Sequence, residues 1–189
     1  MAAARGPAED AELTRLIDAT SSMIRMYAPD GLSRWLLVDV RAQRLVLVRD
    51  QAAVRQWPVS TAAAGLDNRD GSGGTPPGVH AIERKIGAGA PPGTVFASRE
   101  PTGEIWRPDA DGDDDRDLIL TRVLTLAGLE PGVNRGPGID SRERYIYIHG
   151  TNRETAVGSP ESAGCVRMTG DDVCELFDLV EEGDPVVIV

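Results

Sequence analysis

The sequence predicts a mostly β fold, a sandwich or barrel with a few helices, and three observations support this. Most apolar residues lie in short runs rich in Val, Ile and Leu, as in strands. Turn-forming residues separate these runs, and the 189 residues include 21 Gly and 13 Pro. Helical spacing of apolar residues occurs in only two segments, one near each end of the chain. Many short strands with few helices are typical of a sandwich or barrel.

The elements follow one another along the chain. Residues 8–26 have apolar side chains three and four positions apart with charges between them, which predicts an amphipathic helix. The expected strands, in chain order, are residues 35–40, 44–49, 54–61, 79–86, 94–98, 117–126, 144–149 and 186–189. A second helix is expected after Thr169, whose Thr-Gly-Asp-Asp sequence is a capping signal, and Gly183 and Pro185 end it. We therefore predict an N-terminal helical extension over residues 1–34 and one domain over residues 35–189.

Charge and cysteine content exclude several classes of protein. Thirty acidic residues against 20 basic ones give a net charge of −10, which argues against binding to nucleic acid or to anionic membranes. No stretch is long and apolar enough for a signal peptide or a membrane-spanning helix, so we expect a cytoplasmic protein, or a periplasmic one if another route exports it. Two His and two Cys leave little for a disulfide framework or a zinc site.

Several motifs have simpler explanations than a functional site. The acidic residues 109–117 fit an EF-hand poorly, because its Gly and Glu positions hold Asp114 and Leu120, so we expect a solvated loop. The glycine-rich residues 71–78 lack the Lys of a phosphate-binding loop and are expected to be flexible. His80 is expected to be a structural or surface residue, and Cys174 to pack within the last helix.

His149 and Cys165 are different, because they satisfy the needs of nucleophilic catalysis. A thiol is mostly protonated at neutral pH and needs a nearby base to become a nucleophile. His149 ends a predicted strand, and Cys165 follows Gly164 after a loop that can fold back. Gly164 has no Cβ, so its backbone can turn N–H groups toward an oxyanion, and Arg167 can hold a carboxylate. On these residues alone, an acyl-transfer pair and two unrelated residues both remain open.

The stretch IHGTNRETAVGSPESAGCVRM, residues 148–168, resembles the L,D-transpeptidase catalytic domain, the YkuD-like family of peptidoglycan enzymes. Its His-Gly-Thr, Ser-x-Gly-Cys and hydrophobic-Arg elements occur in the family's order. Upstream, LLVDVRAQRLVLVRDQAAVRQWPVSTA resembles the family's opening pattern, and Gly-Thr-Pro-Pro-Gly at 74–78 resembles its TPxG turn. The resemblance covers residues 35–189 and implies a YkuD-like β-sandwich with a few helices.

The resemblance also implies roles for the residues of the motif. Cys165 would be the nucleophile and His149 its base, with the backbone carbonyl of Gly150 orienting the imidazole. The N–H groups of Gly164 and Cys165 would form the oxyanion hole. Ser162 would support the loop, and Arg167 would contact a substrate carboxylate or order the pocket. No cofactor or metal is implied, and the base predicts a rate that falls from neutral to mildly acidic pH.

The family attacks the L,D bond between diaminopimelate and the terminal D-Ala of a peptidoglycan tetrapeptide. Ala163 stands where many members have His or another polar residue, which places acceptor preference in question. With no export signal expected, the sequence favours an L,D-carboxypeptidase that trims soluble muropeptides in the cytoplasm during recycling. The alternatives are a transpeptidase that cross-links peptidoglycan or exchanges D-amino acids, and an inactive muropeptide-binding module.

Overall fold

The structure is a computed structural model that describes residues 6–29, 32–111 and 115–189. Its helical elements are α1 (Pro7–Tyr27), α2 (Pro108–Asp111), the 3-10 turn η2 (Glu154–Ala156) and α3 (Gly170–Leu179). Its strands are β1 (Arg34–Asp39), β2 (Arg44–Arg49), β3 (Ala52–Pro58), β4 (Gly78–Ile86), β5 (Thr94–Ala97), β6 (Glu100–Ile105), β7 (Ile119–Gly128), β8 (Tyr147–Gly150), β9 (Val166–Met168) and β10 (Pro185–Ile188).

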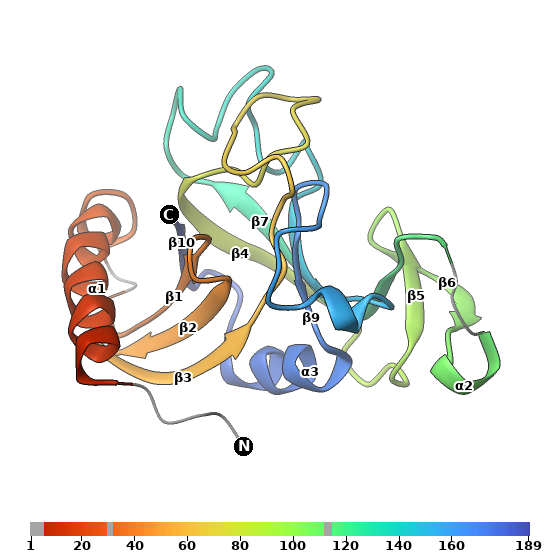
Figure 1. The fold of residues 1–189 in the computed structure, drawn as a ribbon. Coiled ribbons are helices and arrows are strands. Elements are labelled where there is room, and N and C mark those ends of the chain that lie inside the picture. The colour runs from red at the N-terminus through yellow and green to blue at the C-terminus, as the bar shows by residue number, and fades with distance from the viewer. Residues whose placement is uncertain (1–5, 30–31, 112–114) are drawn as a thin grey trace.

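The strands form one mixed sheet, which confirms the mostly β prediction (Figure 1). Their order is β3-β2-β1-β10-β4-β7-β5-β6, and β8 pairs with both β7 and β9. Two of these pairs are parallel, β1 with β10 and β8 with β9. A parallel pair needs a crossover, and for β8 and β9 the loop between them supplies it.

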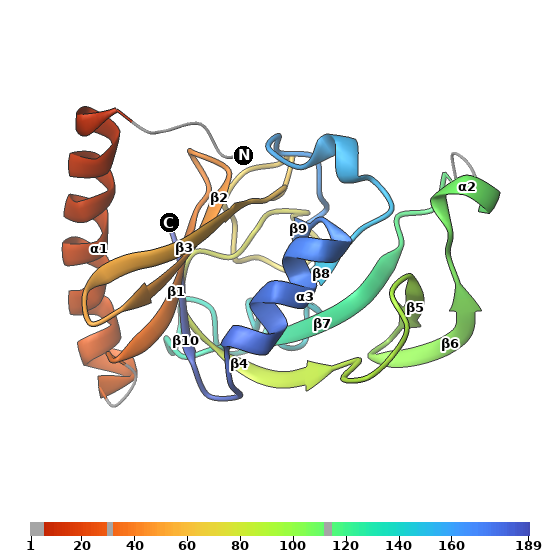
Figure 2. The ribbon, with the colours of Figure 1, turned by 90° about the horizontal axis from the view of Figure 1, so that it is seen from below.

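The two sides of the sheet bury separate apolar clusters. The larger cluster joins the inner faces of β1, β2, β7, β8 and β9 to α3, which lies in front of the strands in Figure 2. On the other side, α1 packs against β1, β2 and β10 through Leu13, Ile17 and Ile24. The amphipathic helix predicted near the N-terminus is therefore confirmed. The division at residue 34 remains a prediction.

Two differences from the predicted elements lie near the motif residues. The strand expected over residues 144–149 begins only at Tyr147, because Tyr145 has φ +57°, a left-handed value far from the extended range of a regular strand. Strand β9 is only three residues long, too short for its alternation to be recognised from sequence. Among the described residues, no helix has the length and apolarity needed to cross a bilayer.

Candidate active site

The pairing of β8 with β9 brings the motif residues together. In this parallel pair, Ile148 lies opposite Val166 and His149 lies opposite Arg167. Ile148 and Val166 point into the main core. Because side chains alternate along a strand, His149 and Arg167 face the other way, and so does Tyr147. Cys165, directly before β9, packs against the cluster that contains Tyr147 and so lies on that side. Register and packing therefore place a base, a thiol and a guanidinium on one face.

His149 is held as a neutral imidazole with a defined tautomer. Its side chain is buried, and Nδ1 lies 2.8 Å from the carbonyl oxygen of Gly150. A carbonyl only accepts, so Nδ1 carries the proton and Nε2 has the lone pair. Burial lowers the pKa of His149 to about 4, although the Gly150 carbonyl and Asp117 raise it. His149 therefore has a basic Nε2 at neutral pH, and no described residue hydrogen-bonds to it.

The Cys165 thiol is half-buried and lies directly before β9. Its Sγ donates to the carbonyl oxygen of Tyr145 at 3.5 Å, and within the described ranges no hydrogen bond joins it to His149. Burial raises the pKa of Cys165 to about 11, while the N–H of Tyr147 and the charge of Arg167 lower it. The resting pair is thus a neutral thiol and a neutral imidazole. Catalytic hydrogen bonds often form only when substrate binds.

The loop before Cys165 is fixed by hydrogen bonds at both of its flanks. Ser162 Oγ donates to the carbonyl of Cys165 at 2.6 Å and accepts from the N–H of Gly164 at 3.2 Å. The buried hydroxyl of Thr75 donates to the carbonyl of Gly164 at 2.9 Å. The end of the glycine-rich segment, expected to be flexible, is therefore tied to the nucleophile loop. The Gly164 N–H, expected in the oxyanion hole, is used inside the loop in this state.

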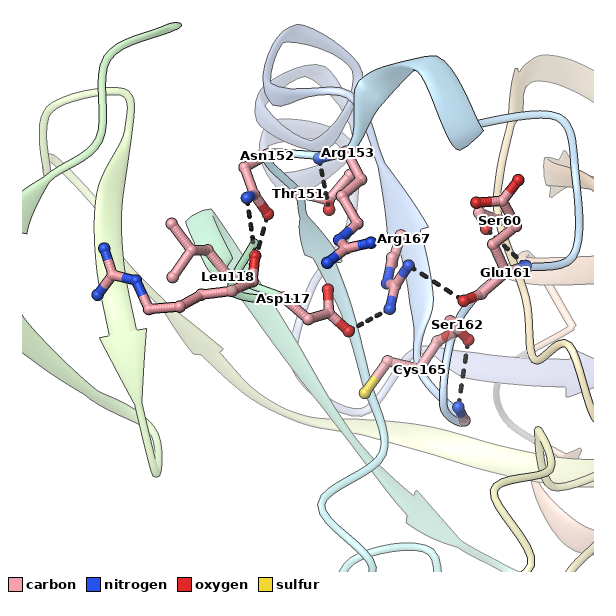
Figure 3. A network of polar contacts seen from close by, with 12 residues as sticks. Ser60, Asp117, Leu118, Thr151, Asn152, Arg153, Glu161, Ser162, Cys165 and Arg167 are labelled. Carbon is pink, nitrogen blue, oxygen red and sulfur yellow. Dashed lines mark hydrogen bonds and ion pairs between the residues drawn. The ribbon is translucent and has the colours of Figure 1, made fainter. Parts of the chain in front are cut away.

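Arg167 lies buried beneath an acidic residue (Figure 3). Its guanidinium forms an ion pair with Asp117 and donates to the carbonyl of Glu161 at 3.4 Å. The Asp117 side chain is 43% exposed, whereas that of Arg167 is 5% exposed, so the carboxylate separates the guanidinium from solvent. Of the two roles expected for Arg167, this geometry matches ordering of the pocket. An incoming carboxylate would have to displace Asp117 to reach it.

Asp117 and Tyr145 are site residues that the sequence did not single out. Asp117 lies at the end of the acidic stretch, whose residues 112–114 fall outside the described ranges. It faces Arg167 across 50 positions of sequence, and no local pattern reports that contact. In the part of the chain that the structure describes, no cluster of His, Cys, Asp and Glu could hold a metal ion.

The second histidine and the second cysteine lie elsewhere. His80 is fully buried, with Nδ1 3.0 Å from the carbonyl of Gly78 and Nε2 2.9 Å from Ser141 Oγ. Cys174 borders a cavity of about 350 Å³ between α3 and the first residues of β7. Helix α3 packs on the main-core side of the sheet, opposite to the side of His149. His149 and Cys165 therefore form the one Cys–His pair in the described residues that shares a strand face.

A thiol and an oriented imidazole on one side of a sheet are the groups that cysteine-dependent acyl transfer requires. The comparison with known proteins agrees with this class. The sequence model of the YkuD family, the L,D-transpeptidase catalytic domain, matches residues 33–188. The chain belongs to this family.

Individual relatives match over different extents. "Putative L,D-transpeptidase YqjB" of Bacillus subtilis is 50% identical over 52 residues, 27% of this chain and 28% of that protein. "Probable L,D-transpeptidase ErfK/SrfK" of Salmonella typhimurium is 28% identical over 173 residues, 87% of this chain and 47% of that protein. The chain thus spans less than half the length of these curated relatives.

Solved structures show the same fold at low sequence identity. L,D-transpeptidase 3 from Mycobacterium tuberculosis, in complex with a faropenem-derived adduct, aligns with a TM-score of 0.50 at 16% identity. The alignment covers 82% of this chain and 60% of that one. This likeness supports the mostly β architecture described above.

Proposed function

We propose that this protein is a cysteine acyl-transferase that attacks the L,D bond between diaminopimelate and the terminal D-Ala of a peptidoglycan tetrapeptide. The observation that carries the proposal is that Cys165 packs against the cluster of Tyr147, which shares the His149 face of β8, while Gly150 fixes the imidazole. Family membership supplies the substrate class. Net charge of −10 favours a small soluble muropeptide over an anionic polymer.

The neutral pair requires proton transfer during attack. As Sγ of Cys165 bonds to the carbonyl carbon of diaminopimelate, its proton passes to Nε2 of His149 and the carbonyl electrons move to the oxygen. The oxyanion is stabilised by backbone N–H groups, for which we assign Cys165 and, once Ser162 releases it, Gly164. The C–N bond then breaks, and the imidazolium gives its proton to the departing D-Ala amine. A thioester at Cys165 remains.

Water is the proposed acceptor for this thioester, which makes the protein an L,D-carboxypeptidase. His149 Nε2 removes a proton from the water, hydroxide attacks the thioester, and the thiol is regenerated. We place this activity in cytoplasmic recycling of soluble muropeptides. Transfer to an amine, giving cross-links or D-amino acid exchange, is the alternative outcome of the same thioester.

Cysteine variants test the nucleophile. Purified protein incubated with the tetrapeptide should release D-Ala, and Cys165→Ala should release none above background. Cys174→Ala is the matched control, because that thiol borders the other side of the sheet, and it should keep the parental rate. Release that persists in Cys165→Ala would refute the assignment. Mass spectrometry of the products with and without added diaminopimelate separates water from amine acceptors, and fractionation of the tagged protein tests its location.

The pH profile tests the base. His149 must be neutral to accept the thiol proton, and its pKa is lowered to about 4 by burial. We therefore expect kcat/KM for D-Ala release to be flat between about pH 5 and 7 and to fall below about pH 4. The fall in rate is therefore expected at lower pH than the mildly acidic range in which an unperturbed imidazole would titrate. A limb centred near pH 6.5 would contradict a buried base.

One observation favours the inactive binding module as a second candidate. The thiol donates to Tyr145 instead of His149, and burial raises the pKa of Cys165 to about 11. A penem is a direct probe, because the M. tuberculosis relative holds a faropenem-derived adduct. An active pair should add one acyl group to the parent chain and none to Cys165→Ala. An unmodified parent that still binds the tetrapeptide would identify the binding module.

A further inference from the structure

The β5–β6 hairpin ends in a turn with an unusual sequence. Ala97 pairs with Glu100, so Ser98 and Arg99 are the two central residues of the turn. Both have positive φ, +47° and +76°, as in the tight turns that normally use Asn-Gly. A left-handed arginine is unfavourable, and such residues persist where the surroundings hold them. The turn therefore fixes the direction in which Arg99 leaves the hairpin.

Arg99 contacts two tyrosines that also contact the nucleophile. Its Nε donates to the hydroxyl of Tyr147 at 3.0 Å, and its guanidinium lies 4.9 Å from the ring centre of Tyr145. Tyr145 accepts the thiol hydrogen bond through its carbonyl. Cys165 packs against the cluster that contains the Tyr147 ring. Tyr145, through its backbone carbonyl, and Tyr147, through its ring, thus connect Arg99 to Cys165.

Arg99 retains donors for a further ligand. It uses Nε for Tyr147 and one terminal nitrogen for the carbonyl of Arg142, at 2.8 Å. A guanidinium has five N–H donors, so the second terminal nitrogen and one proton of the first are left. Among the described residues, Arg99 has no carboxylate partner. The remaining edge has the spacing of a bidentate carboxylate contact.

The other arginines near the thiol are already occupied. Arg167 is buried and paired with Asp117. Arg144, whose charge also acts on the thiol, donates to the carbonyls of Asp67 and Gly74 at 2.9 and 2.7 Å. Arg99 is half-buried, whereas the Tyr145 ring beneath it is 55% exposed. Of these three arginines, Arg99 is the one with a terminal nitrogen that makes no hydrogen bond to a described residue.

We infer that Arg99 binds the terminal carboxylate of the departing D-amino acid and so restricts the enzyme to peptides with a free carboxyl end. This inference rests on the proposed function. The carboxylate of the last residue lies one residue from the carbonyl that Cys165 attacks, so its receptor must adjoin the thiol. Arg99 meets this requirement, while the buried Arg167 orders the pocket with Asp117.

Paired substrates test this inference. The tetrapeptide ending in D-Ala and its C-terminal amide are compared with the parent chain, Arg99→Gln, Arg99→Lys and Arg142→Gln. Loss of a charged hydrogen bond predicts that Arg99→Gln lowers kcat/KM for the acid about tenfold to one hundredfold, mainly through KM, and leaves the amide unchanged. Arg99→Lys should have a kcat/KM for the acid between those of the parent and Arg99→Gln. Arg142→Gln removes an exposed arginine paired with Glu83 and should have no effect.

Three results would overturn the inference: equal rates for acid and amide in the parent, equal losses on both peptides in Arg99→Gln, or a loss confined to kcat. Calorimetry on Cys165→Ala, with and without Arg99→Gln, gives a readout that does not need turnover. Tighter binding of the acid that disappears with Arg99→Gln supports the inference even where the parent releases no D-Ala. Arg99-dependent binding of the acid without D-Ala release would refute the proposed function but not the inference. Equal binding of both peptides would refute the inference.

Discussion

His80 and His149 have nearly the same surroundings and differ at one nitrogen. Both are buried, both direct Nδ1 at the carbonyl of a glycine, and burial lowers the pKa of each to about 4. Nε2 of His80 is bonded to Ser141, whereas Nε2 of His149 has no partner among the described residues and lies on the face of Cys165. A lowered pKa therefore does not identify the base. The unused lone pair beside a thiol does.

The largest expected effect separates these two histidines by activity. His149→Gln should lower kcat/KM for D-Ala release by about 10²–10⁴, because it removes the base, and should leave the fold intact. His80→Gln should keep the activity of the folded protein but lower the free energy of unfolding by about 1–3 kcal/mol, through its broken hydrogen bonds. Kinetics and denaturant unfolding of both variants measure this. Equal loss of activity in folded His80→Gln would remove the distinction.

Acid stability should reveal what the two histidines share. Each folded pKa, about 4, lies below the ordinary value of 6.5, so the unfolded chain binds protons first. Stability is therefore complete above about pH 6.5 and falls toward pH 4, by about 3 kcal/mol per histidine. In His80→Gln, unfolding between about pH 4 and 6.5 should take up about one proton fewer, so the free energy of unfolding should depend less steeply on pH. An unchanged slope would mean that His80 titrates normally in the fold.

Glycines extend the comparison to the loop that precedes Cys165. A Cβ at Gly164, with φ +134°, would lie 3.1 Å from Ile146 Cδ1 and 3.3 Å from the carbonyl oxygen of Gly74. Gly158 also has positive φ, +102°, but a Cβ there would meet nothing within 4 Å. Both Ala variants share the backbone strain, so Gly164→Ala should cost about 1–3 kcal/mol more and slow acylation. Similar unfolding midpoints would show that the loop adapts.

The smallest effect concerns Asp117, which acts on His149 and has no counterpart beside His80. Asp117→Asn removes a charge that raises the pKa of both His149 and Cys165, so the acid limb should move to lower pH. The carboxylate is partly exposed, so the effect should be below about 1 kcal/mol, about fivefold in rate. Asp184→Asn, which breaks a distant pair with Arg34, is the control. An acid limb that stays in place would show that Asp117 does not act on the base.

Local sequence patterns were sufficient for most of the architecture. Amphipathic spacing predicted α1, alternation predicted the strand runs, and a capping signal predicted α3, because each depends on neighbours within a few residues. Strand β6 was missed because nearly all of its residues are exposed and give no apolar alternation. Strand β9 and the late start of β8 were missed, since one is three residues long and the other depends on the left-handed Tyr145. The joining of the strands into one sheet depends on pairing between residues far apart in the sequence, which local patterns do not report.

The sequence by itself determined the chemistry available, one His-Gly-Thr and one Ser-x-Gly-Cys motif, because catalytic residue types stand out against two His and two Cys. The tertiary structure decided how that chemistry is arranged. It buried Arg167 beneath Asp117, closed His80 with Ser141, and brought Arg99 to the tyrosines beside the thiol. These contacts join residues about 50 or more positions apart. Spacing along the chain does not encode such distances, and only the packed sheet sets them.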